Sequence, residues 1–91
     1  MKIYYSKHAE EKFTEESYVF RFRINKSLIR KIIGKPDVID DSRGEKLIVI
    51  AGIDKRHSLV VVYKLFSKGI FVITFFPARK GRYESKILQR R

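Results

Sequence analysis

The sequence predicts one α+β domain in which two N-terminal helices pack on a three- to four-stranded antiparallel sheet, followed by a basic C-terminal segment. Three observations predict this class. The chain has 91 residues, the length of one domain. Apolar residues in its first third recur with helical spacing, and from residue 38 onward short apolar runs alternate with turn residues. We expect a single domain over residues 1–91 with a basic tail over residues 78–91.

The first helix is expected over residues 7–23. Ser6 is a suitable N-cap, and acidic side chains follow in the first turn. Residues 18–24 also alternate like a strand, so spacing alone leaves helix and strand open there, whereas the Glu-rich stretch before them favours helix. Residues 2–5 form either a short strand or a lead-in.

The second helix has clearer boundaries. Asn25 is a suitable N-cap, Gly34 is expected just after the last turn, and Pro36 prevents the helix from continuing. One apolar face is formed by Leu28, Ile29, Ile32 and Ile33.

The pattern then becomes extended. Consecutive hairpins predict an antiparallel meander, and the apolar run over residues 59–62 indicates a central strand buried on both faces, with the helices covering one. Pro77 is expected to end the last strand, and a short helix is expected over residues 85–89. The extended segments are Val38–Asp40, Lys46–Ile53, Leu59–Phe66 and Ile70–Phe76.

Charge is the most informative property of the composition. The net charge is +11. Residues 1–54 hold eleven basic and nine acidic side chains, whereas residues 55–91 hold ten basic side chains and Glu84 alone. A surface of the thermophile type is the alternative explanation, because the chain has one Asn, one Gln and no Cys. Such surfaces pair their charges, however, and the second half lacks the acids to do so. A face that binds a polyanion is therefore favoured.

Several classes of protein are disfavoured. Without Cys there is neither a disulfide framework nor a thiolate zinc site, and a cytoplasmic location is expected. The sequence has no apolar run of 18 residues, so no membrane-spanning helix is expected. His8 and His57 have no carboxylate cluster beside them, and no Gly-rich phosphate loop is present, so we expect neither a metal site nor a cofactor.

Cationic and aromatic residues gather in the second half. Metal-free RNA cleavage needs a proton acceptor for the ribose 2′-OH, cations at the phosphorane oxygens and a proton for the leaving oxygen. Arg79, Arg82 and Lys64 are candidate phosphate stabilisers. Tyr83 or a histidine is the candidate acid, base or stacking residue. The same residues equally describe a passive RNA binder. The wider set of candidate RNA-binding residues is Lys55, Arg56, His57, Lys68, Lys80 and Arg82.

His8 has two interpretations. It lies in Tyr5-Ser6-Lys7-His8-Ala9, at the start of the first helix. It is either a structural residue that ties the helix start to the sheet or a catalytic acid–base.

This opening, together with 33–39, 59–62 and 72–77, resembles a family of short prokaryotic proteins with a Tyr-Ser/Thr-x-His-Ala motif, itself similar to the RelE/ParE toxin superfamily and its BrnT branch. The resemblance implies two helices on an antiparallel sheet and an mRNA endonuclease, acting on free or ribosome-bound RNA and restrained by an antitoxin. It also implies a functional Arg after the last strand, where Arg79 and Tyr83 lie. The region 13–24 is longer than the family's usual connection.

Three hypotheses follow: a toxin-type metal-independent endoribonuclease, a non-catalytic nucleic-acid-binding module, and a basic domain that binds an acidic protein. The expected partners are RNA and an acidic antitoxin; a homodimer is compatible with the sequence, and no membrane partner is expected.

Overall fold

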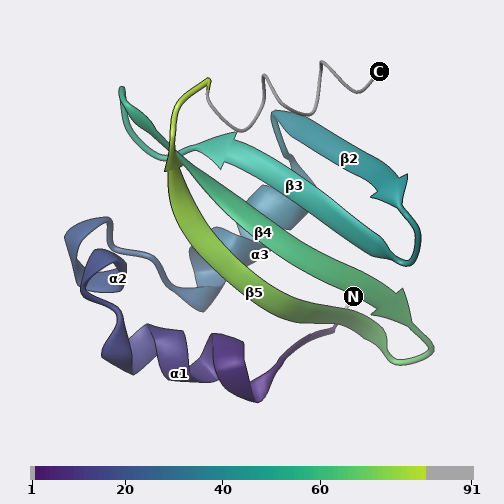
Figure 1. The fold of residues 1–91 in the computed structure, drawn as a ribbon. Helices are drawn as coiled ribbons and strands as arrows, with labels where there is room; N and C mark the ends of the chain where they lie inside the picture. Colours follow the sequence, from purple (N-terminus) through teal and green to yellow (C-terminus); the bar gives the residue numbers. More distant parts are fainter. Residues whose placement is uncertain (1, 82–91) are drawn as a thin grey trace.

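The computed structural model describes residues 2–81, which form an α+β fold with N-terminal helices on a five-stranded sheet (Figure 1). The predicted helix over residues 85–89 lies outside the described residues. The elements in chain order are β1 (Ile3–Tyr5), α1 (Lys7–Glu15), α2 (Ser17–Arg21), α3 (Lys26–Gly34), β2 (Val38–Arg43), β3 (Lys46–Gly52), β4 (His57–Phe66) and β5 (Gly69–Arg79).

The sheet is mixed, so the prediction of a three- to four-stranded antiparallel sheet was only partly right. The strand order is β1-β5-β4-β3-β2, and all pairs except β1–β5 are antiparallel. Residues 3–5 pair in parallel with Ile70–Val72 of β5. A pattern of three residues is too short to distinguish a strand from an irregular segment that leads into the first helix. The sequence therefore predicted either one for residues 2–5.

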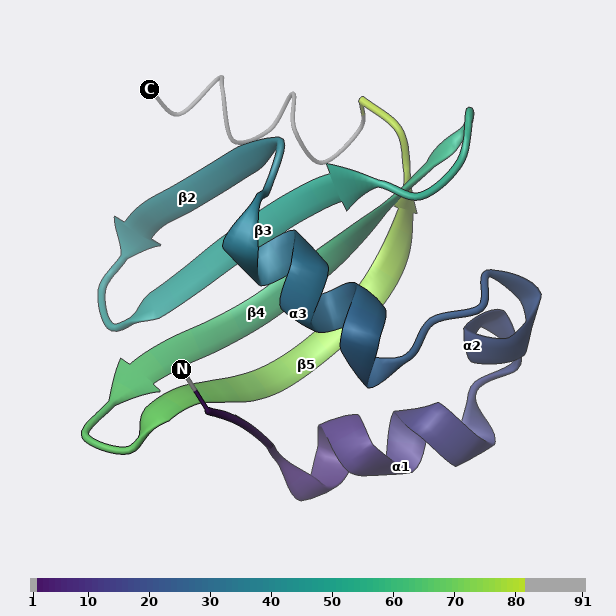
Figure 2. The same ribbon diagram turned by 180° about the vertical axis from the view of Figure 1, so that it is seen from behind.

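The predicted first helix is divided into two. Glu16 has an extended backbone (φ −87°, ψ 124°) and separates α1 from α2. The alternating stretch that begins at Tyr18 continues as the short helix α2 rather than as a strand. The helical layer therefore has three helices, not two, and α1 and α2 meet at an angle (Figure 2).

Ser6 connects α1 to the sheet. Its hydroxyl accepts the N–H of Ala9 (3.0 Å), which caps the helix, and donates to the carbonyl of Ile73 (2.6 Å). The Ser6 N–H also donates to the carbonyl of Val72 (2.9 Å). Both carbonyls are available because Ile73 is the extra residue of a β-bulge, between Val72 and Thr74. The Ser and Ala of the opening motif thus have a structural role, since Ala9 is fully buried.

Helix α3 packs its apolar side on β3 and β4, as the spacing predicted (Figure 2). Asn25 caps it by accepting the N–H of Leu28 (2.8 Å), and Ile29 and Ile32 are buried. Gly34 is the last helical residue, and Lys35 is the C-cap with an extended φ of −148°. The sequence predicted Gly34 as the C′ residue, beyond the C-cap, but C′ is Pro36, so the prediction was wrong by two positions.

Strand β4 is buried on both faces over its first part, as predicted, and is exposed from Lys64 to Phe66. Leu59, Val60 and Val61 have no exposed surface. Leu59 and Val61 belong to the cluster under the helices, whereas Val60 belongs to a second cluster with Ile48 and Ile50 on the opposite face. Among the described residues, none of the helices is long and apolar enough to cross a membrane.

Pro77 lies inside β5 and does not end it, contrary to the prediction. The carbonyls of Ile73 and Phe75 point away from β4, because they accept bonds from Ser6 and Lys12. Pro77, two residues on, has the same orientation. Its missing N–H therefore falls on the side where β1 has already ended, so no ladder bond is lost.

Asp40 is a buried carboxylate on the edge strand β2. Its Oδ1 accepts the backbone N–H of Ser42 (2.9 Å) and the Ser42 hydroxyl, and its Oδ2 lies 3.4 Å from Nε of Arg43. The pKa of Asp40 is held below its ordinary value of 3.8. The hydrogen bond from the Ser42 hydroxyl is the largest cause, and the Ser42 N–H and the charge of Arg43 add to it.

We expect Asp40→Asn to lower stability at neutral pH by about 1–3 kcal/mol and to flatten the acid limb of the stability profile. Because the folded pKa is depressed, the carboxylate contributes stability that is fully present above pH 3.8 and is lost as the pH falls through the lower folded pKa. Urea midpoints measured from neutral pH downward test this. Equal acid sensitivity of variant and wild type would contradict it.

Candidate functional site

One end of the sheet gathers the β3–β4 turn and the end of β5. His57 is the register partner of Arg79, which places the two side chains on one face about 5 Å apart at Cβ. The Lys80 N–H donates to the carbonyl of Arg56 (2.7 Å), and the Lys80 ammonium donates to the carbonyl of Asp54 (3.1 Å). These contacts hold the turn against the strand end.

His57 is oriented by Asp54. The imidazole Nδ1 lies 3.1 Å from Oδ1 and 3.2 Å from Oδ2 of the carboxylate. An ionised carboxylate only accepts, so Nδ1 carries the proton and Nε2 is the nitrogen available for proton transfer. The ring also packs on Phe22, with centroids 4.8 Å apart. Both contacts restrict its rotation.

Asp54 is itself fixed by the turn. Its Oδ1 accepts the backbone N–H groups of Arg56 and His57, each at 2.7 Å. The Arg56 N–H is the main cause that lowers the pKa of Asp54, and the ring and N–H of His57 add to it. Asp54 therefore stays ionised at neutral pH and holds the imidazole in one tautomer.

The first half of the chain adds three cations to this end. Arg23 and Lys31 line a hollow of about 470 Å³ with Gly52. Lys35 lines a neighbouring hollow with Asp37 and Gly52. The ammonium of Lys80 also reaches Gly52. We call the whole set the basic end; it consists of Arg23, Lys31, Lys35, Lys55, Arg56, Arg79 and Lys80, all exposed.

Arg23 has an unusual backbone. It follows α2 with φ of 55°, in the left-handed region that favours glycine. The Ile24 N–H donates to the carbonyl of Val19 (2.8 Å) and the Arg23 N–H to that of Phe20 (3.3 Å), a complete Schellman motif. An arginine here costs stability that glycine would not, and such strain is common at functional sites.

We expect Arg23→Gly to stabilise the protein by about 0.5–1 kcal/mol, since relief of left-handed strain exceeds the entropic cost of glycine. Arg23→Ala is the matched control, because it removes the same charge and keeps the strain. Thermal melts of the two variants measure the difference in stability. A less stable Arg23→Gly variant would contradict the strain argument.

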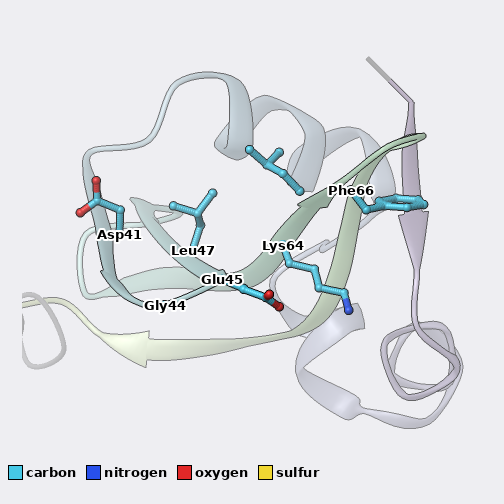
Figure 3. Close-up of a pocket in the computed structure, with 7 residues that line it drawn as sticks. Asp41, Gly44, Glu45, Leu47, Lys64 and Phe66 are labelled. Carbon is cyan, nitrogen blue, oxygen red and sulfur yellow. The ribbon is translucent and has the colours of Figure 1, made fainter.

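Two of the sequence-predicted residues lie at the other end of the sheet. Lys64 is seven residues along β4 from His57, about 23 Å away and on the opposite face. Lys68 is in the β4–β5 turn beside it. Lys64 lines a hollow of about 490 Å³ with Glu45, Leu47 and Phe66 (Figure 3). The structure therefore does not bring Lys64 together with Arg79.

The remaining candidates do not join the basic end within the described residues. His8 is exposed on α1. The link between helix start and sheet, which was the structural interpretation of His8, is made by Ser6. Arg82 and Tyr83 lie outside the described residues. Within residues 2–81, no three His, Asp or Glu side chains converge as metal ligands.

Comparisons with known proteins do not add an assignment. No protein-family model, curated protein or solved structure matched the chain. The geometry of the basic end is therefore the ground for a functional proposal.

Sequence reasoning missed Asp54, Phe22 and the three cations of the first half. Asp54 had a detectable signal, because an aspartate three residues before His57 in a turn can bond both the backbone and the ring. Lys31 lies in the last turn of α3 and Lys35 is its C-cap, so both cations belong to the C-terminal end of this helix. Nothing in the sequence indicated that Phe22 would meet His57.

Proposed function

We propose that this protein is a toxin-type endoribonuclease that cleaves mRNA without a metal ion, with its site at the basic end. The observation that carries the proposal is the His57 imidazole, held through Nδ1 by Asp54 and paired in register with Arg79. It combines an oriented base with a cation on the same face.

In this mechanism Nε2 of His57 takes the proton of the ribose 2′-OH. The 2′-oxygen bonds to the adjacent phosphorus, and the bond from phosphorus to the 5′-oxygen breaks. Arg79 neutralises the charge that grows on the non-bridging oxygens, and the exposed lysines of the basic end hold the flanking phosphates. A proton from solvent or a further acid completes the leaving 5′-hydroxyl, and the products end in 2′,3′-cyclic phosphate and 5′-OH.

The resemblance to RelE/ParE toxins supports this proposal. N-terminal helices on a sheet are compatible with that fold, and Arg79 near the end of β5 corresponds to the arginine that the resemblance implies. An acidic antitoxin would then cover the basic end, where the seven cations outnumber the two nearby acidic residues, Asp37 and Asp54. Co-purification with a small acidic product of the adjacent gene would support this partner.

The second candidate is a non-catalytic RNA-binding module. It is favoured by the fact that His57 is the one imidazole at the basic end within residues 2–81, because cleavage uses both a base and an acid. In this case the same cations would contact only the phosphate backbone.

Incubation of the purified protein with RNA in EDTA separates the two candidates. Discrete products with cyclic phosphate ends, from free RNA or from mRNA on programmed ribosomes, are expected for the nuclease. Binding without products on either substrate would leave the binding module. Binding that is insensitive to salt would contradict both, since phosphate contacts release counterions.

A further inference from the structure

A row of four side chains crosses the sheet on the face opposite to the helices. Tyr4 of β1 is the register partner of Phe71 in β5, Phe71 is the partner of Lys64 in β4, and Lys64 is the partner of Lys46 in β3. Register partners on adjacent strands point to the same face. We call this set, Tyr4, Phe71, Lys64 and Lys46, the cross-sheet row.

Cations flank the aromatic rings of this row on both sides. Lys2 lies over the ring of Tyr4 (5.4 Å), and Lys64 lies over the ring of Phe71 (5.6 Å). Phe66 stands edge-on between the two aromatic rings, with centroids 5.4 Å from Tyr4 and 6.3 Å from Phe71. Phe66 is 39% exposed, although it is a large apolar residue.

The row also has an unbalanced charge. Lys46 and Lys64 lie directly opposite each other, a pairing of like charges that destabilises antiparallel strands. Neither forms an ion pair within the described residues. Asp41 and Glu45 are the acidic side chains that line the same hollow as Lys64 (Figure 3). An anion bound between the two lysines would remove their repulsion.

We propose that the cross-sheet row and Phe66 form a second contact for single-stranded RNA, in which bases stack on the aromatic rings and phosphates bind Lys46 and Lys64. Every base has a face that can stack, and sheets that bind single strands combine such rings with flanking cations. The proposal rests on RNA as the ligand of the proposed function but not on cleavage. It gives Lys64 a binding role at the end of the sheet remote from His57.

The test compares two uncleavable oligomers at one salt concentration, a 2′-O-methyl oligouridylate and the same backbone without bases. Wild type should bind the uridylate more tightly. Phe66→Leu should reduce that preference about tenfold and leave affinity for the base-free oligomer unchanged. Phe71→Leu is a second variant with the same expectation. Phe20→Leu is the matched control, because Phe20 is 67% exposed on α2 and should have no effect.

A charge variant tests the other half of the contact. Glu45→Gln should tighten binding of both oligomers, and Lys46→Gln should weaken both and lower the salt slope by about 0.7.

The outcomes separate this inference from the proposed function. Equal affinity of wild type for the two oligomers, or equal loss of both in Phe66→Leu, would overturn the stacking contact while RNA binding stands. Binding of neither oligomer would overturn the inference, whereas the proposed function would still be decided by the cleavage assay with programmed ribosomes. A poly-glutamate peptide whose affinity falls in Phe66→Leu would assign the row to an acidic protein and overturn the inference.

Discussion

Replacement of His57 by Gln is expected to reduce the rate of RNA cleavage by about 10²- to 10⁴-fold, the usual contribution of a positioned acid–base group. Glutamine keeps the size and polarity of the ring but cannot take the proton of the 2′-OH. RNA binding should change little, because the basic end keeps its seven cations. Single-turnover cleavage in EDTA measures the effect, and circular dichroism verifies that the variant folds.

His8→Gln is the matched control. Both histidines belong to the same sequence, but His8 is exposed on α1 and its imidazole has no hydrogen bond within the described residues. It should cleave at the wild-type rate. If His8→Gln lost activity and His57→Gln kept it, the site would lie along α1, and the basic end would be a binding surface only.

Asp54→Asn tests the positioning of His57. The asparagine amide can accept the backbone N–H groups of the turn, but it presents a donor as well as an acceptor to Nδ1 and removes the charge. Cleavage should fall less than in His57→Gln, and the pH–rate profile should shift. A purely structural role for Asp54 would lower stability and leave the profile of the folded fraction unchanged.

Local signals predicted much of the fold correctly. Asn25 began α3, the apolar spacing gave its buried face, and alternating runs located four strands within a few residues. What failed depended on contacts far apart in the sequence. Ser6 meets a bulge at Ile73, and the helix breaks at Glu16 although glutamate is itself a good helix former. Strand β1 forms because it pairs with the edge of β5. A segment of three residues is too short for its sequence pattern to predict that pairing.

The candidate site shows the same division. Residues 55–57 lead into β4 and Arg79 lies at the end of β5. Because these two strands form one antiparallel hairpin, the proximity of the residues could be inferred from the pairing. Lys64 was grouped with them because charge was counted along the chain, whereas seven residues of extended strand carry it to the other end and face. The same count gave the first half of the chain a small net charge. Lys31 and Lys35, at the end of α3 and near Gly52, were therefore not recognised as part of the basic end.

Gly69→Ala is expected to destabilise the protein by about 3 kcal/mol and to lower Tm by roughly 12–24 °C. Gly69 begins β5 with φ of 142°, a backbone conformation that suits glycine alone. A Cβ atom here would overlap the carbonyl oxygen of Lys2. That oxygen accepts the N–H of Ile70 (3.0 Å), so moving it to relieve the overlap breaks the first bond between β1 and β5.

Gly34→Ala is the matched control, because Gly34 ends α3 without a positive φ and a Cβ there meets no atom within 4 Å. It should be neutral or stabilise the protein by up to about 1 kcal/mol. A Gly69→Ala variant that melts with wild type would contradict the parallel pairing of β1. If it melts lower, its folded fraction should also lose the base preference at the cross-sheet row, since β1 supplies Tyr4, while cleavage at His57 persists.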